Sequence, residues 1–217
     1  ALIKFDQTSK VQLRRVYRRL LREYGPQGWW PARSRYEVIV GAILTQNTSW
    51  KNVKKAIANL RKARMLSLRK IAAADLRYLQ RLVRPSGFYR QKAERLRRVS
   101  NYIVTNYRDL GRFFARPKNV IRNELLSLNG IGKETADSIL LYAGNKLIFP
   151  IDAYTVRMCR CLGMRVREKE RGYERLRKLF ERELPRSVSA YKEMHALIVE
   201  WGKRYRKEKD ACEALLR

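Results

Sequence analysis

The sequence has one histidine, His195, among its 217 residues. A single imidazole cannot build the histidine clusters that hold zinc or iron in many enzymes, so we expect no metal centre of that kind. His195 lies in a segment whose apolar residues recur at helical spacing, which favours a structural role. Long apolar runs, a signal peptide and lipidation motifs are also missing, and we expect no membrane partner.

The three cysteines, Cys159, Cys161 and Cys212, are odd in number and do not suit a disulfide framework. This usage favours a reducing compartment and a cytoplasmic location, with association with the nucleoid if the source is a prokaryote. Cys159 and Cys161 form a C-x-C pair without a second pair or a nearby histidine. On a helix these two side chains point to different faces, so we expect no metal site there.

Acidic residues are scarce: 20 Asp and Glu stand against 50 Lys and Arg, which gives a formal net charge of +30 and a pI near 10.7. Self-repulsion on this scale favours a polyanionic partner. Nucleic acid fits best, because phosphate contacts release counterions and give affinity that does not depend on base sequence. The charged surface of a thermophilic protein is the alternative, but such surfaces usually mix both signs.

Hydrophobic residues make up 45% of the chain, including four Trp and twelve Tyr, which excludes a disordered basic tail. They recur at the period of a helix almost throughout, and no alternating segment is long enough to predict a strand. The sequence therefore predicts an all-α protein with two packed helical layers and a cleft between them. We expect helices over residues 11–24, 35–45, 50–61, 66–74, 75–82, 89–106, 117–127, 138–143, 153–162, 171–183 and 187–206.

The most informative segment is Leu128-Asn129-Gly130-Ile131-Gly132-Lys133, with Pro150-Ile151-Asp152 further along the chain. Glycine permits positive φ and close approach of the backbone, so this turn can present N–H groups to an anion. The helix that begins near Lys133 directs its unpaired N–H groups the same way, which suits a phosphate. For the glycines alone, a capped helix followed by an ordinary turn is the alternative.

Four blocks together resemble the helix-hairpin-helix DNA glycosylases of the endonuclease III superfamily. Residues 128–136 are similar to the hairpin and residues 150–157 to the family's Gly/Pro-rich loop with its Asp. Residues 44–48 are similar to the loop after the first barrel helix, and residues 87–93 to the family's Gly-(Phe/Tyr)-x-x-x-Lys-Ala helix start. The blocks occur in the family's order and span residues 28–205, nearly the whole chain.

This resemblance implies two helical subdomains with a cleft between them. A six-helix barrel would span residues 36–146, with the hairpin at 123–143, and a second helical domain would combine residues 1–35 and 147–217. Gln46 would fill the space left by a flipped base, although Gln46 and Asn47 could instead simply start the next helix. The implied DNA contacts are Gly130, Ile131, Gly132, Lys133, Thr135, Gln46 and Asn47.

Two departures from the family pattern refine the expected chemistry. Members that use a Schiff-base lysine carry it where this chain has Glu134, and Lys133 stands one position too early. One residue rotates a helical side chain by about 100°, so Lys133 should not reach the same place. We therefore expect glycosidic cleavage without AP lyase activity. The C-terminal region retains only Cys212, too few thiols for an iron–sulfur cluster, and we expect no cofactor and no metal.

Residues 29–31, 44–48, 83–89 and 130–134 resemble a cluster-free branch of 3-methyladenine DNA glycosylases within this superfamily, and so does the terminal segment with Gly202, Lys203 and Lys209. This resemblance implies a pocket in which aromatic side chains face a flipped, cationic alkylated purine. Each aromatic could instead belong to ordinary core packing. Lys203 is either a plain exposed lysine or, if buried, a neutral amine able to form a carbamate. The implied pocket residues are Trp29, Trp30, Trp50, Lys203 and Lys209.

Asp152 is the expected catalytic group. A carboxylate can stabilise the oxocarbenium-like sugar and orient or deprotonate the attacking water. Asp152 could also cap the helix that follows it, and the two roles are compatible. The sequence thus predicts a monomeric, monofunctional DNA glycosylase that acts on duplex DNA containing an alkylated base. The alternatives are a mismatch uracil or thymine glycosylase and a non-catalytic DNA-binding protein with the same hairpin.

Overall fold

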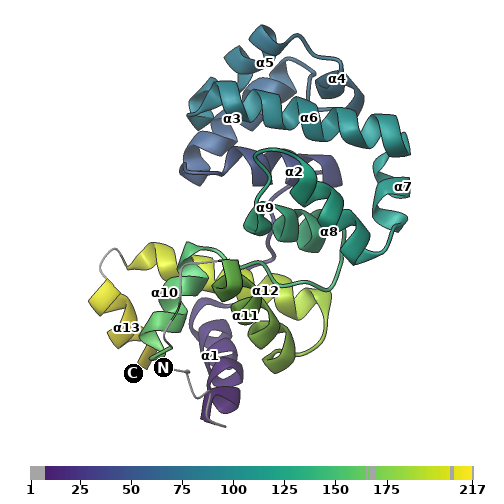
Figure 1. The fold of residues 1–217 in the computed structure, drawn as a ribbon. Helices are drawn as coiled ribbons and strands as arrows, with labels where there is room; N and C mark the ends of the chain where they lie inside the picture. The colour runs from purple at the N-terminus through teal and green to yellow at the C-terminus, as the bar shows by residue number, and fades with distance from the viewer. Residues whose placement is uncertain (1–7, 165, 167–169, 206–207, 217) are drawn as a thin grey trace. The chain divides into compact units, whose positions relative to one another are not determined.

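The structure, a computed structural model, describes residues 8–164, 166, 170–205 and 208–216, and every regular element within them is helical (Figure 1). The predicted all-α fold with two subdomains is confirmed. The chain divides into a central unit, residues 32–146, and a terminal unit, residues 1–31 with 147–217. The sequence places the first boundary between residues 35 and 36. The structure places it earlier because Ser34 caps the first helix of the central unit and accepts from Glu37 N.

The central unit is built around α2 (Arg35–Leu44), whose residues from Tyr36 onward are all buried. A helix that is apolar on every side belongs inside a protein, and α2 packs against α3, α6, α9 and η2. Its one buried carboxylate, Glu37, is paired with Arg61 of α3. The remaining elements are α3 (Trp50–Lys62), α4 (Leu68–Ala72), α5 (Leu76–Val83), the 3-10 turn η1 (Arg84–Ser86), α6 (Tyr89–Tyr107), α7 (Leu110–Ala115), α8 (Lys118–Ser127), α9 (Lys133–Ser138) and the π-helical turn η2 (Ile139–Ala143).

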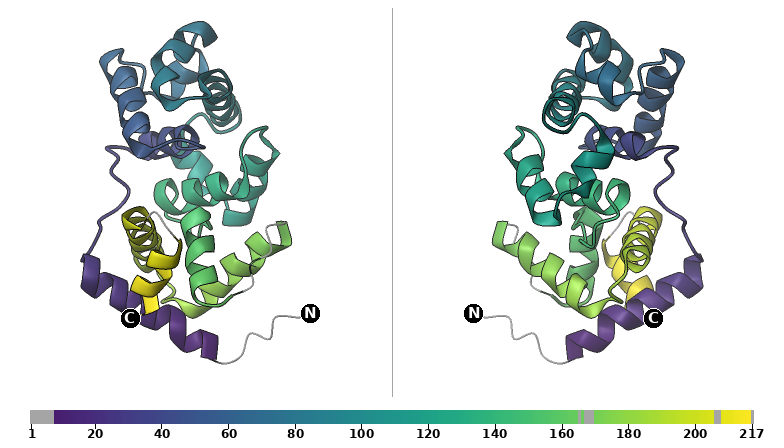
Figure 2. Two further views of the ribbon diagram at one scale, coloured as in Figure 1. Left: turned by 90° about the vertical axis from the view of Figure 1, so that its left-hand side faces the viewer. Right: turned by 90° about the vertical axis from the view of Figure 1, so that its right-hand side faces the viewer.

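Both ends of the chain build the terminal unit, in which α12 contacts α1, α10 and α13 (Figure 2). None of the described helices is long and apolar enough to cross a membrane. The elements are α1 (Thr8–Tyr24), α10 (Ala153–Cys161), α11 (Glu170–Glu183), α12 (Val188–Arg204) and α13 (Glu208–Leu216).

Close packing of α10 on α12 fixes the position of the residues at the start of α10. Gly202 of α12 lies so near the Tyr154 ring that a Cβ there would come within 2.2 Å of it. Arg157 of α10 donates to the carbonyls of Gly202 and Tyr205, at 2.5 and 2.9 Å, and so satisfies the C-terminal end of α12. The glycine and the arginine together hold the two helices in one register.

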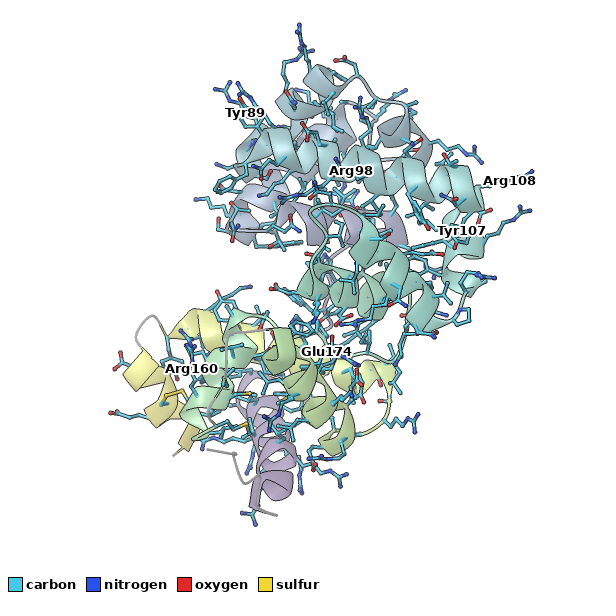
Figure 3. All side chains as sticks on the ribbon, in the orientation of Figure 1. Tyr89, Arg98, Tyr107, Arg108, Arg160 and Glu174 are labelled. Carbon is cyan, nitrogen blue, oxygen red and sulfur yellow. A yellow bond between two sulfur atoms is a disulfide. The ribbon has the colours of Figure 1, made fainter. Side chains whose placement is uncertain are left out.

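The prediction that the cysteines form no disulfide is wrong. Cys161, the last residue of α10, is bonded to Cys212 of α13, with the two Cα atoms 4.8 Å apart (Figure 3). The partners are 51 residues apart in sequence, and only the packing of α13 on α10 brings them together. Cys159 remains a free thiol inside the protein, and its burial raises its pKa to about 12. Among the described residues, no three His, Cys, Asp or Glu side chains gather where they could hold a metal ion.

Candidate active site and DNA interface

Asp152 is the N-cap of α10, in extended backbone with φ −105° and ψ 179°. Its Oδ1 accepts two hydrogen bonds from one residue, from Thr155 N and from Thr155 Oγ1, both at 2.7 Å. An N-cap carboxylate satisfies a donor that the first turn leaves unpaired, and the bond fixes its direction. The capping and catalytic roles foreseen for Asp152 are therefore structurally compatible.

The second carboxylate oxygen faces the only histidine of the chain. His195 Nε2 lies 3.5 Å from Asp152 Oδ2, and the Asp152 side chain is 11% exposed. Burial raises the pKa of Asp152, but the nearby His195 and the hydrogen bonds from Thr155 together lower it by more, so the net shift is below its ordinary value. His195 does lie buried in a helix, as the sequence indicates, but its position beside Asp152 was not foreseen.

Aromatic side chains surround this pair within the terminal unit. The Trp29 ring centroid is 6.2 Å from that of His195 and 5.2 Å from that of Trp30. The ammonium of Lys203 lies 5.3 Å from the centre of the Trp29 ring. Three of the predicted pocket residues therefore gather with Asp152 in one unit, and His195 connects the two parts of the group.

The predictions for Lys203, Trp50 and Lys209 as pocket residues have different outcomes. Lys203 is exposed, which agrees with the first of its two alternatives, and the burial that a neutral amine and a carbamate would require is not found. Trp50 is the first residue of α3 in the central unit, and it is half-buried. The side chain of Lys209 lies outside the described residues.

The hairpin joins α8 to α9 in the central unit. Gly130 has φ +87°, and Ile131 N closes the turn on Leu128 O at 3.0 Å. Ile131 is buried, which anchors the turn in the core. Arg122 of α8 binds Asp137 of α9 through two hydrogen bonds, of 2.6 and 3.1 Å. The buried carboxylate is thus satisfied, and the two helices are held together at the base of the hairpin.

Gly132 is exposed at the tip of the hairpin. Gly132 has an ordinary φ of −87°, and a Cβ added to it would meet nothing within 4 Å. Lys133 is the first residue of α9 and is half-buried, and Glu134 is exposed. Open space beside the Cα atom of Gly132 allows another molecule to approach the backbone closely, as phosphate binding by this turn requires.

Gln46 is bound to the hairpin through its side-chain amide. Its Nε2 donates to Gly130 O at 3.1 Å and to Thr135 Oγ1 at 2.9 Å, and its Oε1 accepts from Arg95 at 2.6 Å. The buried Thr135 is therefore an internal partner of Gln46 here, whereas Asn47 is exposed with φ +52°. For Gln46 to fill a gap in DNA, these bonds must be exchanged for bonds to the nucleic acid.

Sequence reasoning assigned no role to Phe88, which the structure shows on the surface. It is 62% exposed, the one large hydrophobic side chain of that exposure among the described residues. It follows Gly87 and stands at the N-cap of α6 with φ +44°. Arg84 and Arg90 lie over the neighbouring Tyr89 ring, labelled in Figure 3, with 6.0 and 5.9 Å to its centre. The sequence signal for this exposed side chain was a Gly-Phe pair directly before a helix. The Phe lies outside the apolar face of that helix.

The buried Lys92 ties the segments that carry Gln46 and Phe88. Its ammonium donates to Leu44 O at 2.9 Å and to Ser86 O at 2.6 Å, and its side chain has no exposed surface. Leu44 ends α2 just before Gln46, and Ser86 precedes Phe88 by two residues. Burial, with a smaller contribution from Arg95, lowers the pKa of Lys92 to about 8.

We predict that this lysine makes stability depend on pH. Between pH 8 and the ordinary pKa of 10.5 the unfolded chain holds a proton that the folded chain lacks, so stability should rise as the pH increases through this window. Relative to Lys92→Met, the wild type should gain up to about 3 kcal/mol, at about 1.4 kcal/mol per pH unit. Urea unfolding of both proteins at several pH values measures the difference, and a constant difference would contradict the prediction.

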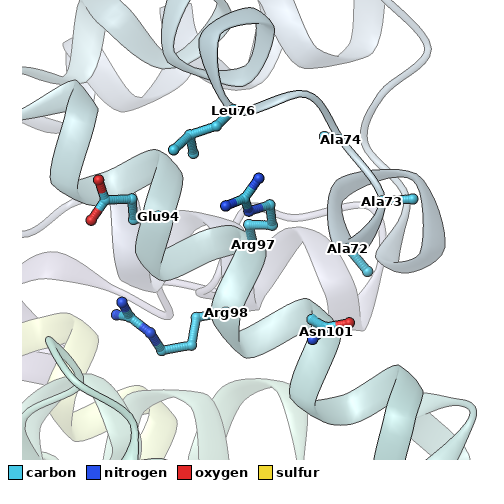
Figure 4. A pocket seen from close by; sticks show the side chains of 8 residues that line it. All are labelled: Ala72, Ala73, Ala74, Leu76, Glu94, Arg97, Arg98 and Asn101. Atoms are coloured by element: carbon cyan, nitrogen blue, oxygen red, sulfur yellow. The ribbon is translucent and has the colours of Figure 1, made fainter.

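A surface depression of about 580 Å³ also lies in the central unit (Figure 4). Residues 72–74 and Leu76 form one side of it, and α6 forms the other with Glu94, Arg97, Arg98 and Asn101. Arg98 also donates to Asn129 O in the hairpin turn at 2.8 Å. None of the predicted site residues lines this depression, and Arg98 is its connection to the hairpin turn.

The family model for HhH-GPD superfamily base excision DNA repair proteins matches residues 40–186, a span that holds the hairpin and Asp152. The chain belongs to this superfamily. A Methanocaldococcus jannaschii protein named as a DNA repair glycosylase is 50% identical over 201 residues, which cover 92% of this chain and 90% of that protein. Endonuclease III of Thermotoga maritima is 31% identical over 82% of this chain and 78% of its own length.

Among solved structures, the crystal structure of the H. pylori 3-methyladenine DNA glycosylase bound to 1,N6-ethenoadenine is similar, with a TM-score of 0.78 and 32% identity. The match covers 90% of this chain and 97% of that one. This HhH-GPD protein is therefore a DNA repair glycosylase, and the resemblance seen in the sequence is confirmed.

Proposed function

We propose that this HhH-GPD protein is a monofunctional glycosylase that flips an alkylated, 3-methyladenine-type base out of duplex DNA and hydrolyses its glycosidic bond with the help of Asp152. The observation that carries the proposal is the group formed by Asp152, His195 and Trp29 in the terminal unit. It combines an ionised carboxylate with an aromatic face that already holds a cation. The 32% identity with a 3-methyladenine glycosylase supports the same substrate class.

The chemistry of an alkylated purine explains why the site needs so few catalytic groups. A purine alkylated at N3 or N7 is cationic and leaves as a neutral base, so no strong general acid is required. The positive charge that develops on the sugar is the costly part, and a carboxylate held in place stabilises it without reorganising. The exposed Lys203 can leave the face of Trp29, and a flat cationic ring would then stack in its place.

The hairpin and two side chains of the central unit would bind the DNA. We propose that the N–H groups at Gly132 and Lys133 hold a phosphate, and that Phe88 inserts between bases while Gln46 occupies the vacated position. Arg98 and Arg95 support this surface from α6, through Asn129 O and Gln46 respectively.

We predict that Gly132→Val weakens duplex binding about 10-fold without changing the melting temperature. The added side chain meets no protein atom, so its effect should fall on the phosphate that approaches the turn. Gly130→Val is the contrasting variant, since the positive φ of Gly130 and the contact with Arg95 should make it unstable. Fluorescence anisotropy with damaged and undamaged duplexes gives the affinities. A loss confined to one lesion would point to the base pocket instead.

We also predict that the enzyme leaves the DNA strand intact after excision. Glu134 stands where a Schiff-base lysine would be, and Lys133 is one residue away on the first turn of α9. Borohydride added during the reaction should trap no protein–DNA adduct, and strand breaks should appear only after alkali. An adduct that disappears in Lys133→Ala would establish a lyase and contradict the monofunctional assignment.

A panel of duplexes tests the function as a whole. Each carries one 3-methyladenine, 7-methylguanine, 1,N6-ethenoadenine, uracil opposite guanine or thymine opposite guanine, and alkali reveals the abasic product. We expect excision of the alkylated bases. Excision of uracil or thymine mismatches alone would replace the proposed substrate class with the mismatch class.

A further inference from the structure

We propose that His195 is a positioning residue that fixes the direction of the Asp152 carboxylate through a polar contact with Oδ2. This inference rests on the proposed function, because it assigns His195 a role in the reaction that Asp152 assists. It is carried by the geometry of the carboxylate, which has one oxygen committed to the helix cap and the other facing an imidazole.

The two oxygens of Asp152 have different partners. Oδ1 accepts both donors of Thr155 at 2.7 Å, so its capacity serves the start of α10. Oδ2 is therefore the oxygen that can face the sugar or the attacking water, and His195 Nε2 lies 3.5 Å from it. With Thr155 bound to one oxygen and the imidazole facing the other, the carboxylate has less freedom to rotate than the bonds to Oδ1 alone would leave it. Catalytic groups gain from such preorganisation, because a small misalignment of the reacting group lowers the reaction rate.

The imidazole is itself held in place. His195 is 4% exposed on α12, with its ring edge-on to Phe149 at 6.0 Å and 82° and tilted against Trp29 at 6.2 Å and 45°. The close approach of α12 to α10 at Gly202 and Tyr154 sets the distance between the two helices. A polar ring buried among aromatic rings is costly unless it has a polar partner, and the Asp152 carboxylate is suited to be that partner.

The role follows from the bonds that change. The bond between C1′ and the base nitrogen breaks with its electron pair passing to the base, and the oxygen of water bonds to C1′. The proton of that water passes to Asp152 Oδ2, which must be ionised to receive it. His195 lowers the pKa of this carboxyl and so opposes the effect of burial. Other titratable side chains near the group are Tyr173 of α11, whose hydroxyl accepts from Ile151 N, and Lys203 beside Trp29.

The test compares His195→Leu, which removes the donor, with His195→Gln, whose amide nitrogen can take the place of Nε2. Single-turnover excision should fall about 10- to 100-fold in His195→Leu, with the duplex Kd unchanged. His195→Gln should recover most of the rate. A His195→Leu enzyme as fast as wild type, or a well-folded His195→Gln enzyme as slow as His195→Leu, would overturn the proposal.

Tyr191→Leu is the matched control for packing. Tyr191 lies one turn earlier on α12, and its ring meets the same Phe149 at 5.8 Å and 77°, while its hydroxyl donates to Glu181 O. Removing this ring should lower the melting temperature and leave the excision rate unchanged. Equal losses of rate in Tyr191→Leu and His195→Leu would show that core packing, not the contact with Asp152, is responsible, and would overturn the proposal.

A second measurement needs no reaction. The six aspartates of the chain can be labelled with carbon-13, and their carboxyl signals can be titrated by NMR, with Asp152→Asn giving the assignment. The pKa of Asp152 should be higher in His195→Leu than in the wild type, and an unchanged pKa would overturn the proposal. If the wild type excised no base from the panel, the proposed function would fail, while this titration would still decide whether His195 acts on Asp152.

Discussion

Replacing Asp152 with Asn should lower single-turnover base excision about 10³-fold, with duplex affinity kept or increased. The amide has the size of the carboxylate, and its oxygen can still accept from Thr155 N and cap α10. What is lost is the negative charge that faces the developing sugar cation and accepts the proton of water. Quenched-flow or manual single-turnover assays on an alkylated duplex measure the rate, and an electrophoretic shift measures the binding.

Asp75→Asn is a matched control for the capping role of Asp152. Asp75 caps α5, and its Oδ1 accepts from Tyr78 N at 2.7 Å, the same bond at the same length. The substitution makes the same chemical change at a helix start away from the predicted site. Asp75→Asn should excise at the wild-type rate. If both variants were equally slow, a capping defect would explain the loss and Asp152 would not be the catalytic group.

The parts of this structure that follow from local sequence could be predicted. Apolar residues at helical spacing specify helices such as α2 and α12 without reference to the rest of the chain. The hairpin was also local, since Gly130 needs its positive φ and Ile131 needs burial within the same few residues. Asp152 belongs to this class too, because the N-cap position is set by the helix that follows it.

Contacts between residues far apart in the sequence could not be predicted. The Cys161–Cys212 bond joins two helices 51 residues apart, and nothing in either local sequence indicates the pairing. The approach of His195 to Asp152 depends on how α12 packs on α10, which the helical pattern of each segment does not determine. The sequence therefore indicated only that His195, on an apolar helix face, is a core residue. In the fold it is both buried and next to the predicted catalytic group.

The exposure of single side chains was the third feature that the sequence did not determine. Lys203 and Phe88 both sit at positions where a helical pattern allows either face, and the packing of neighbouring elements decides the outcome. For Lys203 the structure shows the exposed alternative, without the burial that a carbamate would require, and for Phe88 it shows a large apolar side chain open to solvent. Residues at the ends of helices are thus where the sequence determines the exposure of a side chain least.

Opening the disulfide should lower the free energy of unfolding by about 4 kcal/mol, the chain-entropy value for a loop of this length. Cys161 and Cys212 close a loop of 51 residues that contains α11 and α12, so reduction frees a large part of the unfolded chain. In the folded state α13 would keep its buried Ala211 and Leu215 and the bonds from Arg19 to Ala214 O and Leu215 O, at 2.7 and 3.0 Å. The fold should therefore survive in Cys212→Ser, with its urea midpoint lowered.

Cys159→Ala is the control for this prediction, because Cys159 is buried in α10 but forms no disulfide. Reductant should lower the urea midpoint of the wild type and of Cys159→Ala by the same amount, and should have no effect on Cys212→Ser. A thiol count establishes that reduction is complete in each sample. If the fully reduced wild type kept the midpoint of the oxidised protein, the loop would not be restrained by this bond, and α13 would be held by Arg19 and its apolar face alone.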